Sequence, residues 1–340
     1  MRKLNVKQKM WHDAHSRKKL KLKTKYNKKR KNCRYQSKYN LNRNHSPHIL
    51  IAPRILNVIE NCEETLKFFA DAEETIKKCK LNDKIYFDLK NIEIISVDAI
   101  MYLIAMICNY RRIRALRIVC EGNFPQKDKA KEVIEKSGFY RFVSTGKSYK
   151  NVKTDKTIQI TSGKEADPQT ASKVCDFIAS SLPCTLIATK KLYAMIIELM
   201  TNTKQHAYNN TEKVMDDKWY FFAENIETGK VKFVFLDTGV GIPKTVKKKF
   251  WESISSAFRN DDAKLIAAAL SNEYNRSETK KLYRGKGLPG IYDNSVTRYI
   301  SDLIIVSGQG MCVVDKYGVI STRRITNKLL GTMFCWTISI

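Results

Sequence analysis

The sequence predicts an α/β protein with two folded domains behind a basic N-terminal arm. Between residues 49 and 150, strand-like apolar runs alternate with helix-periodic segments. Between residues 165 and 340, long helical segments are followed by strands joined through short turns, and the first 45 residues concentrate positive charge. At 340 residues the chain is long enough for two cores. We expect an arm at 1–48, a first domain at 49–150, a linker at 151–164 and a second domain at 165–340.

The arm is the most strongly charged part of the chain. Residues 1–45 hold 17 Lys or Arg residues and one acidic residue, within a net charge of +28. Such a segment repels itself and has few apolar residues, so we expect it to be disordered or helical without a core. Lysines and arginines that meet phosphates release counterions, and Trp11, Tyr26, Tyr35 and Tyr39 can stack on unpaired bases. DNA or RNA, an acidic protein surface, or no specific partner all remain open for this arm.

The cysteines and the apolar runs indicate a soluble, cytoplasmic protein. The nine cysteines are scattered without a CxxC pair, which favours a reducing compartment and argues against a zinc ribbon or a disulfide framework. The N-terminus carries charge but no apolar signal-peptide segment. The longest apolar run, residues 99–108, falls short of the ~20 residues that span a bilayer. We expect that run to be a buried helix.

The first domain is expected to be a compact α/β layer. KIYFDLKNIEIIS alternates as a strand does, VDAIMYLIAMICNYRR follows as a buried helix, and ALRIVCEG is a further strand. This pattern resembles the STAS domain of anti-sigma-factor antagonists, whose strand-to-helix loop carries a phosphorylatable hydroxyl. Val97 stands at that position here, and Ser96 before it is expected to cap the helix. The resemblance implies a domain that docks a protein partner or the second domain.

One predicted helix in the second domain carries an unusual polar face. Residues 192–208 read LYAMIIELMTNTKQHAY, in which Glu198, Asn202 and His206 recur at four-residue intervals and therefore lie on one face. Leu192 and Leu199 belong to an apolar stripe on roughly the opposite side. An acid, an amide and an imidazole on a core-packed helix predict one wall of a ligand site. A merely solvated polar face is the alternative.

Three glycine-containing segments follow this helix. VKFVFLDTGVGIP (231–243) predicts a strand ending at Asp237, RGKGLPGI (284–291) a turn before a helix, and GTMFCWTI (331–338) a terminal strand. Nine of the 14 glycines lie after residue 230. Glycine lets the backbone approach a ligand closely and adopt positive φ. An ordinary β-turn explains the DxGxG pattern equally well when it is taken alone.

In this order and spacing, the four segments resemble the GHKL superfamily of ATP-binding domains over roughly half the chain. The resemblance implies a two-layer α/β sandwich with helices on one face, which binds ATP and Mg²⁺. It implies that Asn202 ligates Mg²⁺ and that Asp237 accepts a hydrogen bond from the adenine amino group. It also places Gly239, Gly241 and Thr332 beside the adenine.

The resemblance assigns the phosphates to the second glycine segment. Gly285, Gly287 and Gly290 would present backbone N–H groups at a helix N-terminus. Arg284 and Lys286 are placed to add positive charge. A proline between the second and third glycines departs from the family's usual spacing. Residues 250–283, which contain a short helical run AKLIAAAL, correspond to the family's ATP lid.

Three functions remain open at this stage. In the first, the protein is an ATP-driven switch with slow hydrolysis, in which Glu198 polarises the attacking water or orients Asn202, and His206 contacts a phosphate or has a structural role. In the second, it is a protein serine kinase, because TNTKQHAY resembles the corresponding motif of anti-sigma-factor kinases. In the third, it is a non-catalytic adaptor that binds nucleic acid under nucleotide control. The ATPase is favoured because the carboxylate is present and no phosphoryl acceptor is evident in the chain; a homodimer is compatible with each function.

Overall fold

The computed structural model describes residues 47–79, 83–113, 119–143, 152, 154–182, 186–206, 218–250, 259–271, 287–296 and 300–339. Residues 1–46 of the expected basic arm lie outside this set, so its expected nucleic-acid or acidic-protein partner stays a prediction. None of the helices in the described ranges is both long and apolar enough to cross a membrane.

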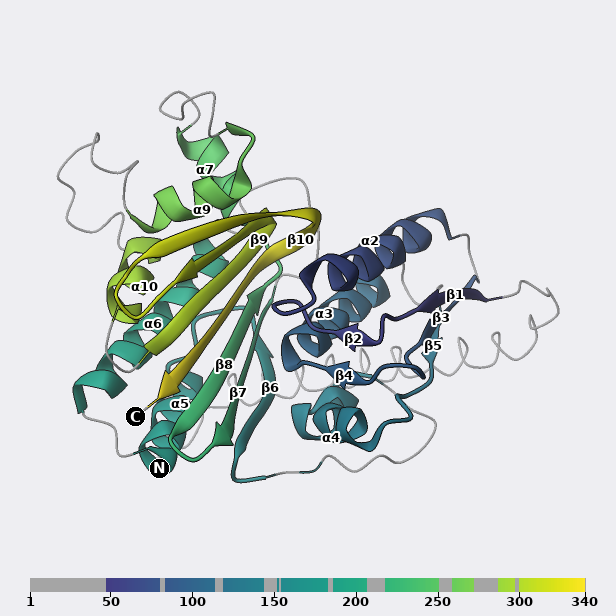
Figure 1. Ribbon diagram of the computed structural model, residues 1–340, viewed down its shortest axis with the longest axis horizontal. Coiled ribbons are helices and arrows are strands. Elements are labelled where there is room, and N and C mark those ends of the chain that lie inside the picture. Colours follow the sequence, from purple (N-terminus) through teal and green to yellow (C-terminus); the bar gives the residue numbers. More distant parts are fainter. Residues whose placement is uncertain are drawn as a thin grey trace, which may run out of the picture. The chain divides into compact units, whose positions relative to one another are not determined.

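The described part of the N-terminal half contains two small parallel sheets, three α-helices and one 3-10 turn, as the alternating pattern predicts (Figure 1). The three-stranded sheet has the order β1-β3-β5, and the remaining two strands pair as β2-β4. The strands are β1 (His48–Ile51), β2 (Ile55–Leu56), β3 (Lys84–Asp88), β4 (Ile94–Ile95) and β5 (Val119–Gly122), and the helices are α2 (Cys62–Lys78), α3 (Val97–Ile113), α4 (Asp128–Ser137) and the 3-10 turn η1 (Phe139–Arg141). The apolar run at residues 99–108 lies inside α3, and most of its side chains are fully buried.

The C-terminal half is built on one antiparallel five-stranded sheet of order β6-β7-β8-β10-β9. Its strands are β6 (Thr157–Gly163), β7 (Trp219–Glu227), β8 (Lys230–Asp237), β9 (Ile300–Val314) and β10 (Ile320–Ser339), and its helices are α5 (Pro168–Ser181), α6 (Leu186–His206), α7 (Ile242–Phe250), α9 (Asp262–Leu270) and α10 (Gly287–Ser295). Asp167 caps α5, because its side chain accepts a hydrogen bond from the Gln169 backbone N–H at 3.0 Å. The AKLIAAAL run forms α9 as expected.

Both faces of the five-stranded sheet are apolar and buried. On β8, Phe233 and Phe235 pack with α5, α6 and α10, whereas Val234 and Leu236 belong to the core that α2 and α3 share with the sheet. The helices of the C-terminal half therefore occupy one face, as the two-layer prediction requires. The helices of the N-terminal half cover the opposite face (Figure 1). The two halves thus share a continuous hydrophobic core.

Two features of this sheet differ from the expectation. Part of the segment expected to be a linker, 151–164, forms β6 and pairs with β7. The last two strands form one long hairpin, with the tip at residues 315–319, and the expected terminal strand at 331–338 is only the second half of β10. Residues 321–324 of β10 are polar and exposed, because this part of the hairpin extends past the end of β8. A prediction based on apolar runs therefore does not identify this part of the strand.

Candidate functional site

The first predicted group of site residues comes together where α6 meets α10. Gly287 is the first residue of α10, and a Cβ atom added to it would lie 2.7 Å from Asn202 Oδ1 and 3.3 Å from Glu198 Oε1. The carboxylate and the amide of α6 therefore lie directly against the backbone at the N-terminus of α10. Such an N-terminus presents free N–H groups and a partial positive charge. The spacing of Glu198 and Asn202 was visible in the sequence, but their contact with Gly287 depends on tertiary packing.

The polar atoms of this group have an environment suited to a ligand. The side-chain amide nitrogen of Asn202 is buried and has no hydrogen-bond partner among the described atoms. The O and N ends of an asparagine amide are assigned from such partners, so the oxygen can equally face this position. Burial raises the pKa of the Glu198 carboxyl above its ordinary value. A buried amide without a partner costs free energy unless a ligand satisfies it.

These residues fit a magnesium ion bound with phosphates. Mg²⁺ takes hard oxygen ligands, retains several waters and is usually held by one or two protein groups together with the phosphates. Asn202 supplies an amide oxygen, Glu198 supplies a carboxylate one helical turn away, and Gly287 leaves the space between them open. An alanine in place of Gly287 would fill that space.

The second predicted group forms where the end of β8 meets the middle of β10. Asp237 is the last residue of β8 and lies directly opposite Thr332 in the β8–β10 ladder. The carboxylate accepts hydrogen bonds from the Gly239 backbone N–H at 2.8 Å and from the Thr332 hydroxyl. Burial nevertheless dominates and raises the pKa of Asp237 to about 6, although part of the side chain remains exposed. A partly exposed, desolvated carboxylate at a strand end is a strong acceptor for an incoming donor.

Two glycines bring the backbone segments of this group into contact. Gly331 has φ +95°, and a Cβ atom there would lie 2.1 Å from the backbone oxygen of Asp237. Gly241 has φ +88°, and a Cβ atom there would lie 2.9 Å from Ser307 Oγ. Only glycine tolerates this combination of conformation and crowding. Both glycines therefore allow the segment around Asp237 to approach β9 and β10 closely.

Ser307 is a site residue that the sequence analysis missed. It is fully buried on β9, where its hydroxyl donates to the Gly331 carbonyl at 2.8 Å and accepts from the Ile242 backbone N–H at 3.0 Å. Its oxygen also lies 3.0 Å from Thr332 Oγ1. The available signal was a serine inside the apolar run LIIVSG, where a polar residue needs buried partners.

The two groups belong to elements that share one core. Leu199 of α6, Ile291 of α10 and Phe235 of β8 are members of the same buried cluster. Gly290 lies on α10, and a Cβ atom there would meet no protein atom within 4 Å.

Several predicted site residues, or their side chains, are not among those that the structure describes. Arg284, Gly285 and Lys286 precede the first described residue of α10. His206 is the last residue of α6, and its side chain is not among those described. Most of the predicted lid lies outside as well, apart from residues 250 and 259–271. Their expected roles stay predictions.

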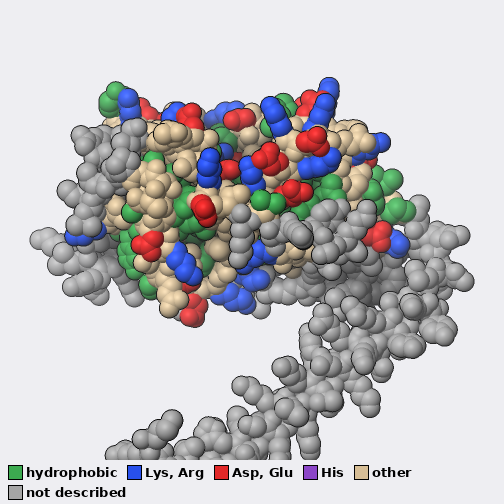
Figure 2. Space-filling view, turned by 90° about the horizontal axis from the view of Figure 1, so that it is seen from below, with side chains coloured by type: hydrophobic (Ala, Val, Ile, Leu, Met, Phe, Trp, Pro, Cys, Tyr) green, Lys and Arg blue, Asp and Glu red, His purple; other side chains and the backbone are tan. Residues whose placement is uncertain are grey.

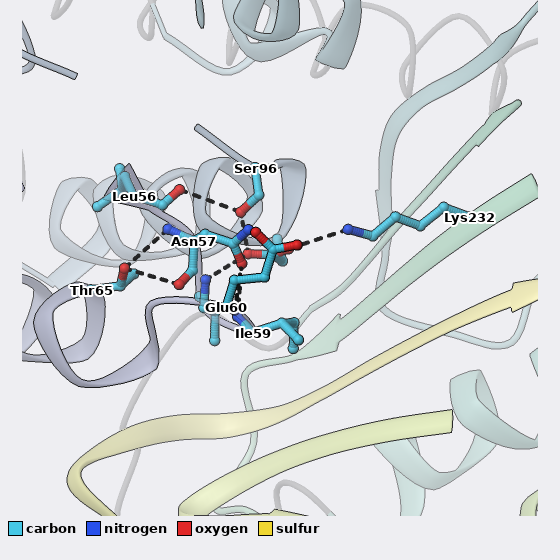
Figure 3. Close-up of polar contacts among 9 residues, drawn as sticks. Leu56, Asn57, Ile59, Glu60, Thr65, Ser96 and Lys232 are labelled. Atoms are coloured by element: carbon cyan, nitrogen blue, oxygen red, sulfur yellow. Dashed lines mark hydrogen bonds and ion pairs between the residues drawn. The ribbon is translucent and has the colours of Figure 1, made fainter. Parts of the chain in front are cut away.

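The second group is also tied to the N-terminal half. The Leu330 backbone N–H, two residues before Thr332, donates to the Tyr102 hydroxyl oxygen of α3 at 3.0 Å. On β8, Lys232 Nζ lies 3.8 Å from Asp98 Oδ2, and Figure 3 shows the lysine extending toward the polar cluster that contains Asn57 and Ser96. Asp98 is fully buried, and its other oxygen accepts from the Val58 backbone N–H at 2.9 Å.

The Asp98 carboxylate affects both the pKa of Lys232 and the hydrogen bonding of Ser96. Burial disfavours the charged form of Lys232, but Asp98 and other acidic groups outweigh it, so the pKa of Lys232 is raised. The Ser96 hydroxyl, which we expected to accept from an N–H of α3, instead donates to Asp98 and to the Leu56 carbonyl. Ser96 therefore orients the carboxylate that faces β8.

The structure thus contains two candidate ligand-binding groups, one at the α6–α10 contact and one where the end of β8 meets the middle of β10. A hydrogen bond from β10 and an ion pair from β8 connect the second group to the N-terminal half. No known protein-family model matches this chain, and no curated protein matches it.

Proposed function

We propose that the C-terminal half binds Mg²⁺-ATP in the manner of the GHKL superfamily, and that the protein is a slow ATPase that works as a conformational switch. The observation that carries the proposal is the position of Gly287 against Asn202 and Glu198. Three residues from two separate sequence motifs meet there, and each has the chemistry that its motif requires. The pairing of Asp237 with Thr332 adds the third and fourth motifs.

Each group of residues has a distinct task in this proposal. Asp237 accepts a hydrogen bond from the adenine amino group, and Thr332 and Gly239 hold its carboxylate in position. Asn202 and the N-terminus of α10 hold the magnesium and phosphate end of the nucleotide, and the bound Mg²⁺ neutralises phosphate charge. Glu198 takes a proton from the attacking water, and its raised pKa suits a general base.

The contacts with the N-terminal half support a switch. Tyr102 holds Leu330, and Asp98 pairs with Lys232, so α3 contacts both strands that carry the proposed adenine group. A nucleotide that binds one arrangement of these strands more tightly than another shifts the equilibrium between the two. We propose that the N-terminal half passes this shift to a protein partner.

Purified protein distinguishes the proposal from its alternatives. Calorimetric titration with ATP, with and without Mg²⁺, is expected to show one Mg²⁺-dependent site per chain, and phosphate release is expected to be slow. Asn202→Ala is expected to lose the Mg²⁺-dependent binding, whereas Asn294→Ala, a change to an asparagine at the opposite end of α10, is expected to retain it. Absence of ATP binding by the wild type refutes the proposal. Transfer of labelled phosphate to serine of a protein partner establishes the kinase instead.

We further propose that the arm binds nucleic acid. The described surface mixes both signs of charge, as the face in Figure 2 shows, whereas residues 1–45 are almost purely basic. Removal of residues 1–45 is expected to weaken RNA or DNA binding strongly and to reduce its salt dependence. Unchanged affinity at every salt concentration refutes this role.

A further inference from the structure

Three potential metal ligands from three elements converge at one end of the three-stranded sheet. His48 is the first residue of β1, Cys79 is the residue that follows α2, and Asp83 directly precedes β3. Because β1 and β3 are parallel neighbours, with His48 opposite Ile85, His48 and Asp83 lie at the same end of the two strands. One nitrogen, one sulfur and one oxygen atom from these residues all lie within 4.8 Å of one another.

The distances are close to those of a tetrahedral site. His48 Nε2 lies 3.7 Å from Asp83 Oδ2. Two ligands that each lie ~2.0–2.3 Å from a tetrahedral zinc ion are about 3.3–3.8 Å apart. For a nitrogen and an oxygen ligand the separation is about 3.3–3.5 Å, so the imidazole and the carboxylate need a shift of only about 0.2–0.4 Å, and the thiol one of about 1 Å. A rotation of the cysteine side chain provides such a shift.

The burial of the three residues suits a metal ion that enters from the surface. Cys79 is 4% exposed and Asp83 is 8% exposed, whereas about half of the His48 side chain is accessible. A carboxylate in such a position requires a counter-charge, hydrogen bonds or a metal ion. The accessible imidazole lies on the side from which an ion can arrive.

We propose that His48, Cys79 and Asp83 form a binding site for a divalent metal ion of the zinc class, with a water molecule as the fourth ligand. Thiolate and imidazole ligands favour zinc over magnesium and calcium, which prefer oxygen. This site is independent of the proposed nucleotide site, which lies in the other half of the chain. The bound ion joins the start of β1, immediately after the basic arm, to α2 and β3.

Cobalt titration of the full-length protein, stripped of metal with a chelator, tests this site. Co²⁺ bound to a thiolate in tetrahedral geometry gives a near-ultraviolet charge-transfer band and strong visible bands. We expect one equivalent to saturate these bands in the wild type, and Zn²⁺ to displace the Co²⁺. Cys79→Ser is expected to abolish the charge-transfer band. Cys175→Ser, a change at a buried cysteine of the other half, is expected to leave the band unchanged.

Two further variants keep the inference falsifiable if Cys79→Ser does not fold. His48→Gln alters an exposed side chain and is expected to lower Co²⁺ affinity by more than about 100-fold, the upper end of what loss of an outer-sphere partner costs. Its circular dichroism and its Tm in chelator are expected to match the wild type. Cys33→Ser removes the cysteine of the basic arm and is expected to have no effect. A wild type without the charge-transfer band, a band that persists in Cys79→Ser, or a band lost in Cys33→Ser overturns the site.

Discussion

Replacing Gly287 with alanine probes the contact on which the proposed nucleotide site depends. The new Cβ atom would lie 2.7 Å from Asn202 Oδ1 and 3.2 Å from its Nδ2. Ordinary contact begins near 3.4 Å, so the amide must move by about 0.7 Å. Magnesium holds its ligands at ~2.0–2.1 Å in a nearly ideal octahedron and does not follow such a shift. We expect Mg²⁺-ATP affinity to fall by at least about 10-fold, which corresponds to about 1.4 kcal/mol.

The same substitution should change the stability of the fold very little. Only the end of the Asn202 side chain has to move, and alanine is the better helix former, so we expect the free energy of unfolding to stay within about 1 kcal/mol of the wild type. Gly290→Ala is the matched control on the same helix. Its Cβ atom meets nothing within 4 Å and its backbone N–H is retained, so it should stabilise α10 by ~0.5–1 kcal/mol and preserve ATP affinity.

Isothermal titration with Mg²⁺-ATP and urea unfolding measure the two effects separately. A Gly287→Ala protein that binds Mg²⁺-ATP as tightly as the wild type would refute the assignment of Asn202 to the metal. A loss of affinity in both alanine variants, with unchanged stability, would show that the crowding of Asn202 is not the cause.

Three further predictions concern titratable groups. Because burial raises the pKa of Asp237 from 3.8 to about 6, its protonation stabilises the fold below about pH 4, and this contribution is lost as the pH rises to 6; Asp237→Asn should therefore raise the free energy of unfolding at pH 7.5 by up to about 3 kcal/mol while abolishing ATP binding, as measured by urea unfolding and calorimetry. Glu198→Gln should keep ATP binding but slow phosphate release by roughly 10²–10⁴ in a steady-state assay, and equal turnover would exclude Glu198 as the base. Lys232→Met leaves the buried Asp98 carboxylate without its cation and should cost about 3–5 kcal/mol in urea unfolding, whereas Arg54→Ala, which breaks an exposed ion pair, should cost less than about 1 kcal/mol; equal costs would contradict the role of the buried pair.

Elements with a strong local signal could be predicted from the sequence. The apolar run before Asp237 identified β8, and the helical run AKLIAAAL identified α9. The polar face of α6 was likewise visible, because residues at four-residue spacing share a helix face. These features depend on neighbours within a few residues.

Features that depend on packing between distant segments were not predicted. The runs WYFFA, KFVFL and MFCW alternate between two buried faces, and this uninterrupted hydrophobicity was a usable sign that a second layer covers the sheet. The residues around Ser307 in the sequence do not indicate that its hydroxyl bonds to the backbone of both Gly331 and Ile242. His48 and Cys79 come together only because β1 and β3 are neighbours in a parallel sheet, so no ligand spacing in the sequence reveals them.

The apolar character of both sheet faces has a consequence for biosynthesis. The N-terminal half emerges from the ribosome first. The apolar sides of its helices, which include Phe69 and Tyr102, stay exposed to aggregation until β7, β8 and β10 emerge. β10 is synthesised after all the other described strands, and it pairs with both β8 and β9 in the interior of the sheet. The nascent protein therefore cannot complete its hydrophobic core until β10 has emerged, and a product truncated before Ile320 would be a substrate for quality-control proteases rather than a working fragment.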